Sequence, residues 1–310
     1  MAHHHDHSHA HAHDHAGHSH VPDDFGRAFA IGAILNSAFV AAELFFGYVA
    51  NSLALISDAV HNLSDVAALL LAWGAAWLAA KRPTDKRTYG YRRASILAAL
   101  LNAGLLLVAV GGIAVEAINR LREPAAVSGW TVVWVAALGV VINGATALLF
   151  MRGRHGDLNI RGDYLHMVAD ASVSLGVVVA ALLIMATGWL WLDPAISLGI
   201  AAVVLAGSWG LARDSVNLAL DAVPKGIELA EVRDYLGGLD GVREVHDLHV
   251  WAMSTNETAL TVHLVRPSGH DDAFLHHVCA ELAHRFNIHH ATLQVEANGD
   301  ACKLAPAEMV

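Results

Sequence analysis

Long hydrophobic stretches fill the first two thirds of the chain and predict six membrane-spanning helices. A helix needs about 20 apolar residues to cross the ~30 Å hydrocarbon core of a bilayer, and each stretch reaches that length. Short polar loops separate the stretches. The expected helices lie at about 27–50, 53–80, 94–117, 130–151, 163–187 and 189–213.

After about residue 214 the pattern changes to shorter segments with alternating helix and strand periodicity. IELAEVRDYLGGL and DDAFLHHVCAELAHRF are typical of amphipathic helices, while VREVHDLHVWAM, ETALTVHLV and HATLQVEA are typical of strands. The order αββαβ predicts a small α+β domain with helices over one face of a sheet. The expected organisation is an N-terminal arm at 1–24, a six-helix membrane domain at 25–214, a C-terminal domain at 215–298 and a loose tail at 299–310.

Composition and charge also indicate a membrane protein. Hydrophobic residues make up 55% of the chain and charged residues only 15%, against about 25% charged in soluble domains. Much of the acid behind the net charge of −10 lies in the last third, and the basic residues cluster in short loops. We therefore expect no nucleic-acid partner. Cys279 and Cys302 provide neither a disulfide framework nor a thiolate zinc site.

The distribution of basic residues predicts the orientation in the membrane. KRPTDKRTYGYRR (81–93) contains six Lys or Arg against one Asp, and RGRHGDLNIRG (152–162) contains three Arg. Both loops are expected in the cytoplasm, and an even number of helices then places both termini there. Two Arg in NRLREPAAVSG depart from this pattern. The short chain with brief loops predicts a bacterial inner-membrane protein.

The N-terminus lacks the basic start and apolar stretch of a secretory signal peptide. It reads MAHHHDHSHAHAHDHAGHSH, half of it histidine. Either this is an expression tag or it is a native arm, disordered for want of apolar residues and able to hold metal loosely. Flexible imidazoles impose no geometry, so such an arm would not discriminate well between metals.

A polar motif, D-x-x-H-x-x-x-D, occurs in both the second and the fifth hydrophobic stretch, as DAVHNLSD (58–65) and DYLHMVAD (163–170). On a helix, residues four apart share a face, so the histidine and the last aspartate of each motif point together. The first aspartate, one turn earlier, extends the same stripe. The members are Asp58, His61 and Asp65 in the first motif and Asp163, His166 and Asp170 in the second.

These groups need a partner, because a charged side chain deep in a bilayer costs about 2.5–3.5 kcal/mol on insertion scales. Two antiparallel helices would bring two imidazoles and two carboxylates to one point near the midplane, a His2Asp2 set suited to tetrahedral Zn2+. Cd2+ and Co2+ remain alternatives, whereas Mg2+ and Ca2+ prefer oxygen ligands. A polar network that only joins the helices is the other interpretation. Nothing resembles HExxH, and no enzyme activity is expected.

At three places the sequence resembles the cation diffusion facilitator family, in particular its zinc-transporting branch that includes cobalt-zinc-cadmium resistance proteins. The matching segments are SDAVHNLSD, HMVAD and HDLHVWAMS, and the resemblance extends over about residues 25–297. It implies a homodimer in the lipid bilayer, with C-terminal domains of ferredoxin-like or metallochaperone-like αββαβ fold in the cytoplasm. It also implies that each subunit exports divalent metal in exchange for protons.

The resemblance further implies specific residue roles. A histidine at the first position of both HxxxD motifs favours zinc. Simple strand alternation, however, would place His249 rather than His246 beside His263. The implied transport site is His61, Asp65, His166 and Asp170; the implied cytoplasmic metal site is His246, His263 and Glu296 with His289 as a fourth ligand; and Arg93 with Asp221 forms a charge pair between the membrane and cytoplasmic domains.

Site chemistry also favours proton exchange, because metal binding needs neutral imidazole and ionised carboxylate. Asp58 and Asp163 are candidates for a proton relay, or else are solvated residues near a helix end. The function expected is a proton-coupled zinc antiporter that exports Zn2+, with Cd2+ and Co2+ as further substrates. The alternatives are a membrane metal sensor that does not transport and an intramembrane metalloenzyme, which would need an open coordination position and a general base.

Overall fold

The computed structural model describes the backbone of residues 23–151 and 158–298, and their side chains except at 23–35, 158–160 and 163. The expected His-rich arm, apart from its last two residues, and the whole of the expected tail therefore lie outside the described residues. Six long helices are followed by a small α+β domain. The helices are α1 (Asp23–Val49), α2 (Leu53–Ala79), α3 (Ala94–Arg122), α4 (Gly129–Phe150), α5 (Leu158–Thr187) and α6 (Leu192–Ala219).

The six-helix prediction is confirmed, with small differences at the helix ends. α3 continues to Arg122 instead of ending near 117, and within this extension Arg120 Nε lies 2.8 Å from Glu116 Oε1 one turn earlier. Such a pair stabilises helix beyond the apolar stretch. α5 ends where Gly188 adopts a φ of 75°, a left-handed conformation that glycine adopts without steric cost.

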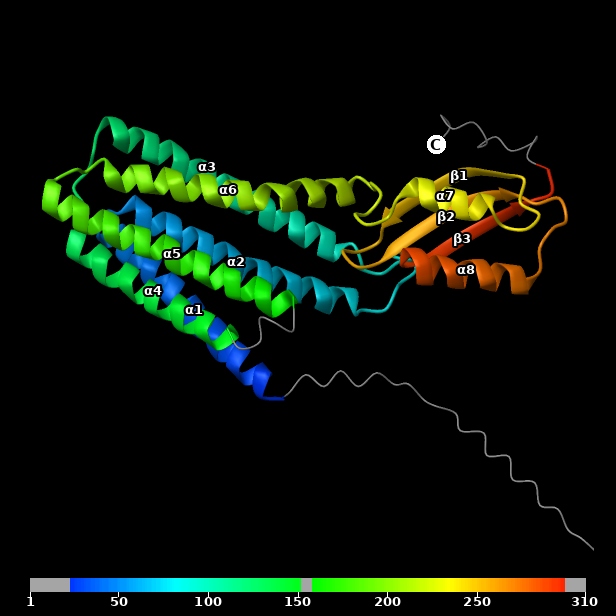
Figure 1. The fold of residues 1–310 in the computed structure, drawn as a ribbon, viewed down its shortest axis with the longest axis horizontal. Helices are drawn as coiled ribbons and strands as arrows, with labels where there is room; N and C mark the ends of the chain where they lie inside the picture. Colours follow the sequence, from blue (N-terminus) through cyan, green and yellow to red (C-terminus); the bar gives the residue numbers. More distant parts are fainter. Residues whose placement is uncertain (1–22, 152–157, 299–310) are drawn as a thin grey trace, which may run out of the picture.

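The helices form a bundle in which α3 and α6 run together beside a group made of α1, α2, α4 and α5 (Figure 1). Within that group, α4 packs along α5 and α1 along α2, and α2 also contacts α5. Among the described residues, which do not include the side chains of the first half of α1, five helices are long and apolar enough to cross a membrane. Large apolar side chains such as Leu70, Val108 and Leu149 point outward. The chain is an integral membrane protein.

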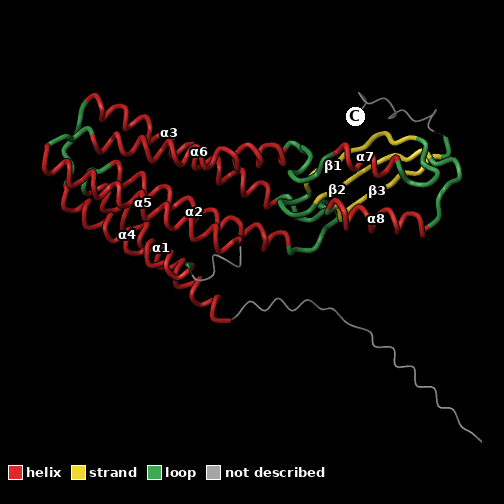
Figure 2. The backbone as a smooth tube through the Cα atoms, in the orientation of Figure 1, coloured by secondary structure: helices red, strands yellow, loops and turns green. Residues whose placement is uncertain are grey.

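The C-terminal domain has the expected order αββαβ. It consists of α7 (Leu229–Gly237), β1 (Glu244–Ala252), β2 (Thr258–Val265), α8 (Asp272–Phe286) and β3 (Ile288–Glu296). The sheet order is β1-β2-β3, antiparallel between β1 and β2 and parallel between β2 and β3 (Figure 2). Apolar residues of the sheet, α7 and α8 form one core, including the fully buried Val232, Leu264 and Leu282.

The first strand departs from simple alternation. The register between β1 and β2 shifts between His246 and His249, and His246 lies opposite His263. At Asp247 the backbone takes a φ of 49°, and such a bulge rotates the following side chains relative to the strand partner. The expectation that His249 would lie beside His263 is therefore wrong, because alternation assumes an unbroken strand.

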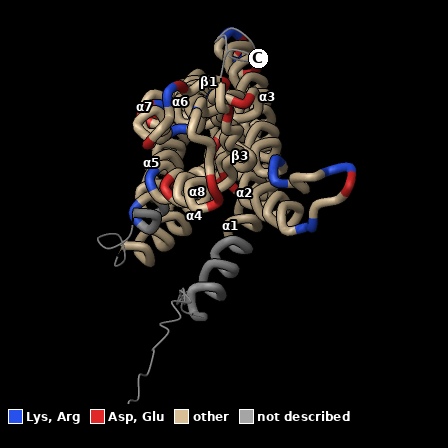
Figure 3. Tube along the Cα trace, turned by 90° about the vertical axis from the view of Figure 1, so that its right-hand side faces the viewer, with Lys and Arg blue, Asp and Glu red and all other residues tan. Residues whose placement is uncertain are grey.

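The loop between α2 and α3 forms ion pairs with the segment after α6 and with the C-terminal domain. Arg93 Nη2 lies 2.5 Å from Asp221 Oδ1 in the segment after α6, which is the pairing that the family resemblance implies. Arg92 Nη1 lies 2.5 Å from Glu257 Oε1, just before β2. Seen from the end with the C-terminal domain, Lys and Arg gather in loops while the helices are mostly uncharged (Figure 3).

Candidate metal centres

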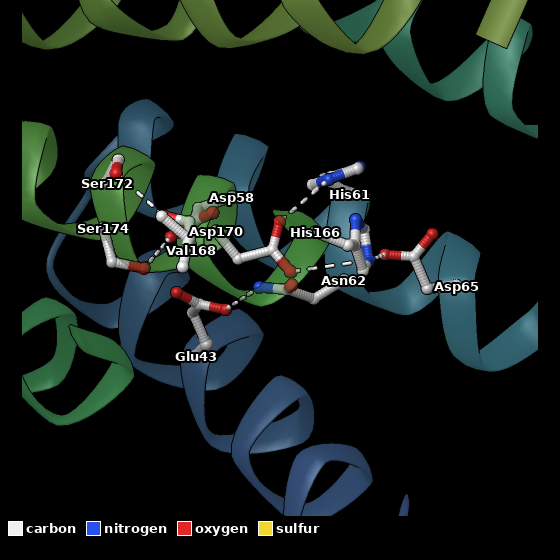
Figure 4. A network of polar contacts seen from close by, with 10 residues as sticks. All are labelled: Glu43, Asp58, His61, Asn62, Asp65, His166, Val168, Asp170, Ser172 and Ser174. Carbon is white, nitrogen blue, oxygen red and sulfur yellow. Dashed lines mark hydrogen bonds and ion pairs between the residues drawn. The ribbon is translucent and has the colours of Figure 1, made fainter. Parts of the chain in front are cut away.

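The first candidate centre lies between α2 and α5, which run in opposite directions and bring the two repeated motifs together (Figures 1 and 4). His61 Nε2 is 3.4 Å from Asp170 Oδ1, and His166 Nε2 is 3.5 Å from Asp170 Oδ2. His166 Nε2 is also 3.2 Å from Asp65 Oδ2. Two residues from each helix therefore contact one another across the helix pair.

The spacing of three of these ligands is short enough for one metal ion. Metal–ligand distances of about 2.0–2.1 Å imply ligand atoms about 3.3 Å apart, and the three contacts measure 3.2–3.5 Å. One ligand atom from each of His61, His166 and Asp170 lies within 4.8 Å of the other two. Asp65 joins them through its contact with His166. Two imidazoles and two carboxylates can hold a divalent ion such as zinc.

The centre is enclosed on one side and open on the other. Asp170 is buried, whereas the side chains of His166 and Asp65 are 41% and 39% exposed. Asp65 follows His61 along α2, and His166 precedes Asp170 along α5. Because the two helices are antiparallel, the more exposed pair lies toward the end of the bundle that carries the C-terminal domain (Figures 1 and 4).

Behind the centre, away from the C-terminal domain, lies a group of buried polar side chains. Asp58 is 0% exposed, and its Oδ2 accepts a hydrogen bond of 2.8 Å from Ser174 Oγ on α5. This burial corrects the alternative that Asp58 is a solvated residue near a helix end. Glu43 on α1 is also 0% exposed and accepts a hydrogen bond from Asn62. The side chain of Asp163, the other relay candidate, lies outside the described residues.

The position of α2 depends on a carboxylate from another helix. Asp193, near the start of α6, is 3% exposed. Its Oδ1 accepts a hydrogen bond of 2.5 Å from Ser52 Oγ, and its Oδ2 accepts one of 2.8 Å from the amide of Leu53. The first amides of a helix have no partner within the helix, and a negative charge is favourable there. Asp193 thereby anchors the helix that carries His61.

The second candidate centre lies in the sheet of the C-terminal domain. His246 Nε2 is 3.5 Å from Glu296 Oε2, and His263 Nδ1 is 3.2 Å from Glu296 Oε1. Both histidines are buried, at 5% and 9% exposure. Neither ring nitrogen of His246 nor Oε2 of Glu296 has a hydrogen-bond partner among the described residues. Buried ligand atoms that lack partners fit a metal ion.

Two residues of this domain differ from the expected set. His289 is the second residue of β3 and lies at the opposite end of the strand from Glu296. It is exposed there, and its Nε2 lies 3.0 Å from Asn287 Oδ1. His289 and Glu296 are seven positions apart along the strand, about 23 Å, so the structure contradicts the assignment of His289 as a fourth ligand. Asp247 was missed, although its Oδ2 lies 3.3 Å from His263 Nε2. The bulge turns its carboxylate toward the site, and alternation could not predict this.

Sequence reasoning also missed Glu43, Asn62, Ser174 and Asp193. A signal existed for Glu43, since it is the only acidic residue in the hydrophobic stretch expected at about 27–50. An isolated carboxylate in a membrane helix indicates a functional or paired group. For Asn62, Ser174 and Asp193 the partners lie on other helices, and only the packing reveals them.

Two family models match the chain. The model described as cation efflux transmembrane domain matches residues 29–218, and the model described as cation efflux protein, cytoplasmic domain, matches residues 224–298. Together these matches cover most of the chain, including both candidate centres.

Three bacterial proteins illustrate the similarity. The cation efflux system protein CzcD of Alcaligenes sp. (strain CT14) is 40% identical over 297 residues, 94% of this chain and 92% of the relative. The zinc transporter ZitB of Escherichia coli (strain K12) is 36% identical over 296 residues, 92% of this chain and 93% of the relative. The cadmium, cobalt and zinc/H(+)-K(+) antiporter of Bacillus subtilis (strain 168) is 34% identical over 286 residues, 90% of this chain and 92% of the relative. The resemblance drawn from the motifs is thus confirmed, and the chain belongs to the cation efflux, or cation diffusion facilitator, family.

Proposed function

We propose that this protein exports zinc across the membrane in exchange for protons, with His61, Asp65, His166 and Asp170 as the transport site. The observation that carries the proposal is the contact between the two motifs inside the helix bundle, with ligand atoms 3.2–3.5 Å apart. Membership of the cation efflux family supports it. The names of the relatives include zinc, cadmium and cobalt, so Cd2+ and Co2+ are further proposed substrates.

The ligand chemistry supports coupling to protons. A metal ion needs neutral imidazole and ionised carboxylate, so loading the site releases protons and protonating it expels the metal. Histidine has an ordinary pKa near 6.5 and changes charge in the physiological range. If the site faces the two sides of the membrane in turn, an inward proton gradient drives outward metal flux.

Orientation follows from where the basic loop lies. The loop at 81–93, with six Lys or Arg, is at the same end of the bundle as the C-terminal domain (Figure 1). By the positive-inside tendency that end faces the cytoplasm, and both termini with it. Since the relatives are bacterial proteins, we place the protein in a bacterial inner membrane. The open side of the transport site would then face the cytoplasm.

The C-terminal domain is proposed to pair two subunits and to sense metal. His246, His263 and Glu296 would hold a zinc ion that stabilises one packing of the two domains over another. A sensor that does not transport would leave the ligand set between α2 and α5 without a role. An enzyme would need a general base and an open coordination position, and two carboxylates with two imidazoles already complete a tetrahedron.

The test is zinc uptake into proteoliposomes with an imposed pH gradient. We expect gradient-dependent uptake by the intact protein and none with Asp65→Ala or Asp170→Ala. Asp240→Ala is the matched control, because this aspartate is exposed in the C-terminal domain and should leave uptake unchanged. Uptake that survives both ligand substitutions would contradict the proposed site.

A further inference from the structure

Glu43 is a buried carboxylic acid that the proposed metal ligands do not include. It lies on α1 and is 0% exposed. Its Oε2 accepts a hydrogen bond of 3.3 Å from Asn62 Nδ2, and its Oε1 accepts no hydrogen bond from an N–H or hydroxyl donor among the described residues. Figure 4 shows it on the side of the candidate centre opposite Asp65.

Asp58 is a second carboxylic acid with the same properties. One oxygen accepts from Ser174, and the other, Oδ1, accepts no hydrogen bond from an N–H or hydroxyl donor in the described part of the chain. The carboxyl groups of Glu43 and Asp58 lie within hydrogen-bonding reach of each other. Two ionised carboxylates only accept hydrogen bonds, so a bond between them requires a proton on one.

Among the described side chains of the helix segments around this pair, none is Lys or Arg. These segments are α2, α4, α1 from residue 36 and α5 from residue 164. The titratable groups nearby are Asp170 on α5 and His61 on α2, and α4 contributes no charged residue. Two negative charges in contact inside a bundle are strongly unfavourable, and sharing one proton removes the conflict.

The pair is also linked to both ligand helices. Asn62, which binds Glu43, directly follows His61 in α2. Ser174, which binds Asp58, lies one helical turn after Asp170 in α5. A divalent ion on the ligands therefore adds positive charge close to the pair, and positive charge favours its ionised form.

We propose that Glu43 and Asp58 form a proton-binding site, which holds one shared proton while the metal site is empty and releases it when zinc binds. The O–H bond of the shared proton breaks, the pair becomes a double anion beside the cation, and the proton passes to water on the open side of the centre. Reprotonation of the pair then favours departure of the metal. This inference rests on the proposed zinc transport.

The test compares the number of protons exchanged per zinc ion in the intact protein and in Glu43→Gln. Glutamine keeps the size, accepts from Asn62 and donates to Asp58, but it cannot release a proton. In proteoliposomes with the membrane potential clamped, we measure the zinc gradient at which net flux stops for a given pH gradient. If one proton fewer is exchanged per zinc ion, the zinc concentration gradient that a difference of one pH unit can balance becomes about tenfold smaller.

Glu116→Gln is the matched control, because Glu116 pairs with Arg120 within α3 and lies outside this network. We expect it to exchange the same number of protons as the intact protein. If Glu43→Gln transports at any rate with an unchanged ratio of protons to zinc, the inference is wrong, since a purely structural role would change the rate and not the ratio.

If Glu43→Gln stops transport, the protons released on zinc binding are counted in detergent instead. The background for each protein is the release measured for the same protein with Asp170→Ala added. We expect one proton fewer for Glu43→Gln and for Asp58→Asn. Unchanged release in both variants would overturn the inference. Failure of zinc transport itself would appear differently, as no pH-driven uptake and no binding dependent on Asp170 in the intact protein.

Discussion

Ser52 and Asp193 form a hydrogen bond of 2.5 Å between the start of α2 and the start of α6. The same carboxylate accepts from the amides of Leu53 and Ala54. An acid from α6 thus completes the first turn of the helix that carries half of the proposed transport site. The two helix ends are expected to move as one unit during transport.

Replacing Asp193 should destabilise the bundle and weaken metal binding. Asp193→Ala leaves buried amides without acceptors, a loss of about 1–3 kcal/mol. We expect a lower thermal unfolding midpoint in detergent and slower zinc uptake. Asp240→Ala, on the exposed surface of the C-terminal domain, should change neither. An unchanged midpoint in Asp193→Ala would show that α2 does not need this anchor.

Substituting His246, which lies in the second candidate centre, and His289, which lies outside it, should have different effects on zinc binding. His246→Ala removes a buried ligand from the second candidate centre, and we expect one zinc ion fewer per chain in metal analysis of the desalted protein. His289→Ala is the control, since His289 lies at the other end of β3 and should leave the zinc content unchanged. A loss of zinc with His289→Ala instead would contradict the geometry of the site.

The bulge in β1 should tolerate only residues that accept a left-handed backbone. Aspartate and asparagine adopt a positive φ at little cost, whereas a β-branched residue does so with strain of about 1–3 kcal/mol. At Asp247, with a φ of 49°, Asp247→Val should lower the thermal unfolding midpoint and reduce zinc retention. Asp247→Asn should keep the midpoint. Equal midpoints for the two variants would indicate that the bulge does not set the register.

The ion pair between Arg92 and Glu257 predicts a charge-reversal rescue. Arg92→Glu places two acids together at the junction of the bundle and the C-terminal domain, and we expect slower zinc uptake. Adding Glu257→Arg should restore the rate, and high salt should weaken both effects because the pair is partly exposed. Arg82→Glu in the same loop is the control, since Arg82 forms no ion pair with the described residues. Failure of the double variant to recover would show that this contact does not couple the domains.

Much of the fold was predictable because the signals are local. Helix lengths follow from the thickness of the membrane, and the order of elements after residue 214 follows from periodicity. The motif spacing placed His61 with Asp65 and His166 with Asp170 on single helix faces. The ligand types, two imidazoles and two carboxylates, favour zinc without any information on packing.

The remaining features depend on contacts between segments far apart in the chain. No local pattern places Glu43 beside Asp58, or Asp193 at the start of α2, because these pairings arise only when the helices pack. Alternation misplaced His246 relative to His263, since one left-handed residue shifted the strand register. The sequence by itself determined which helices carry metal-binding chemistry. Only the tertiary structure decided which buried groups surround that chemistry, because burial and charge compensation are properties of the packed bundle.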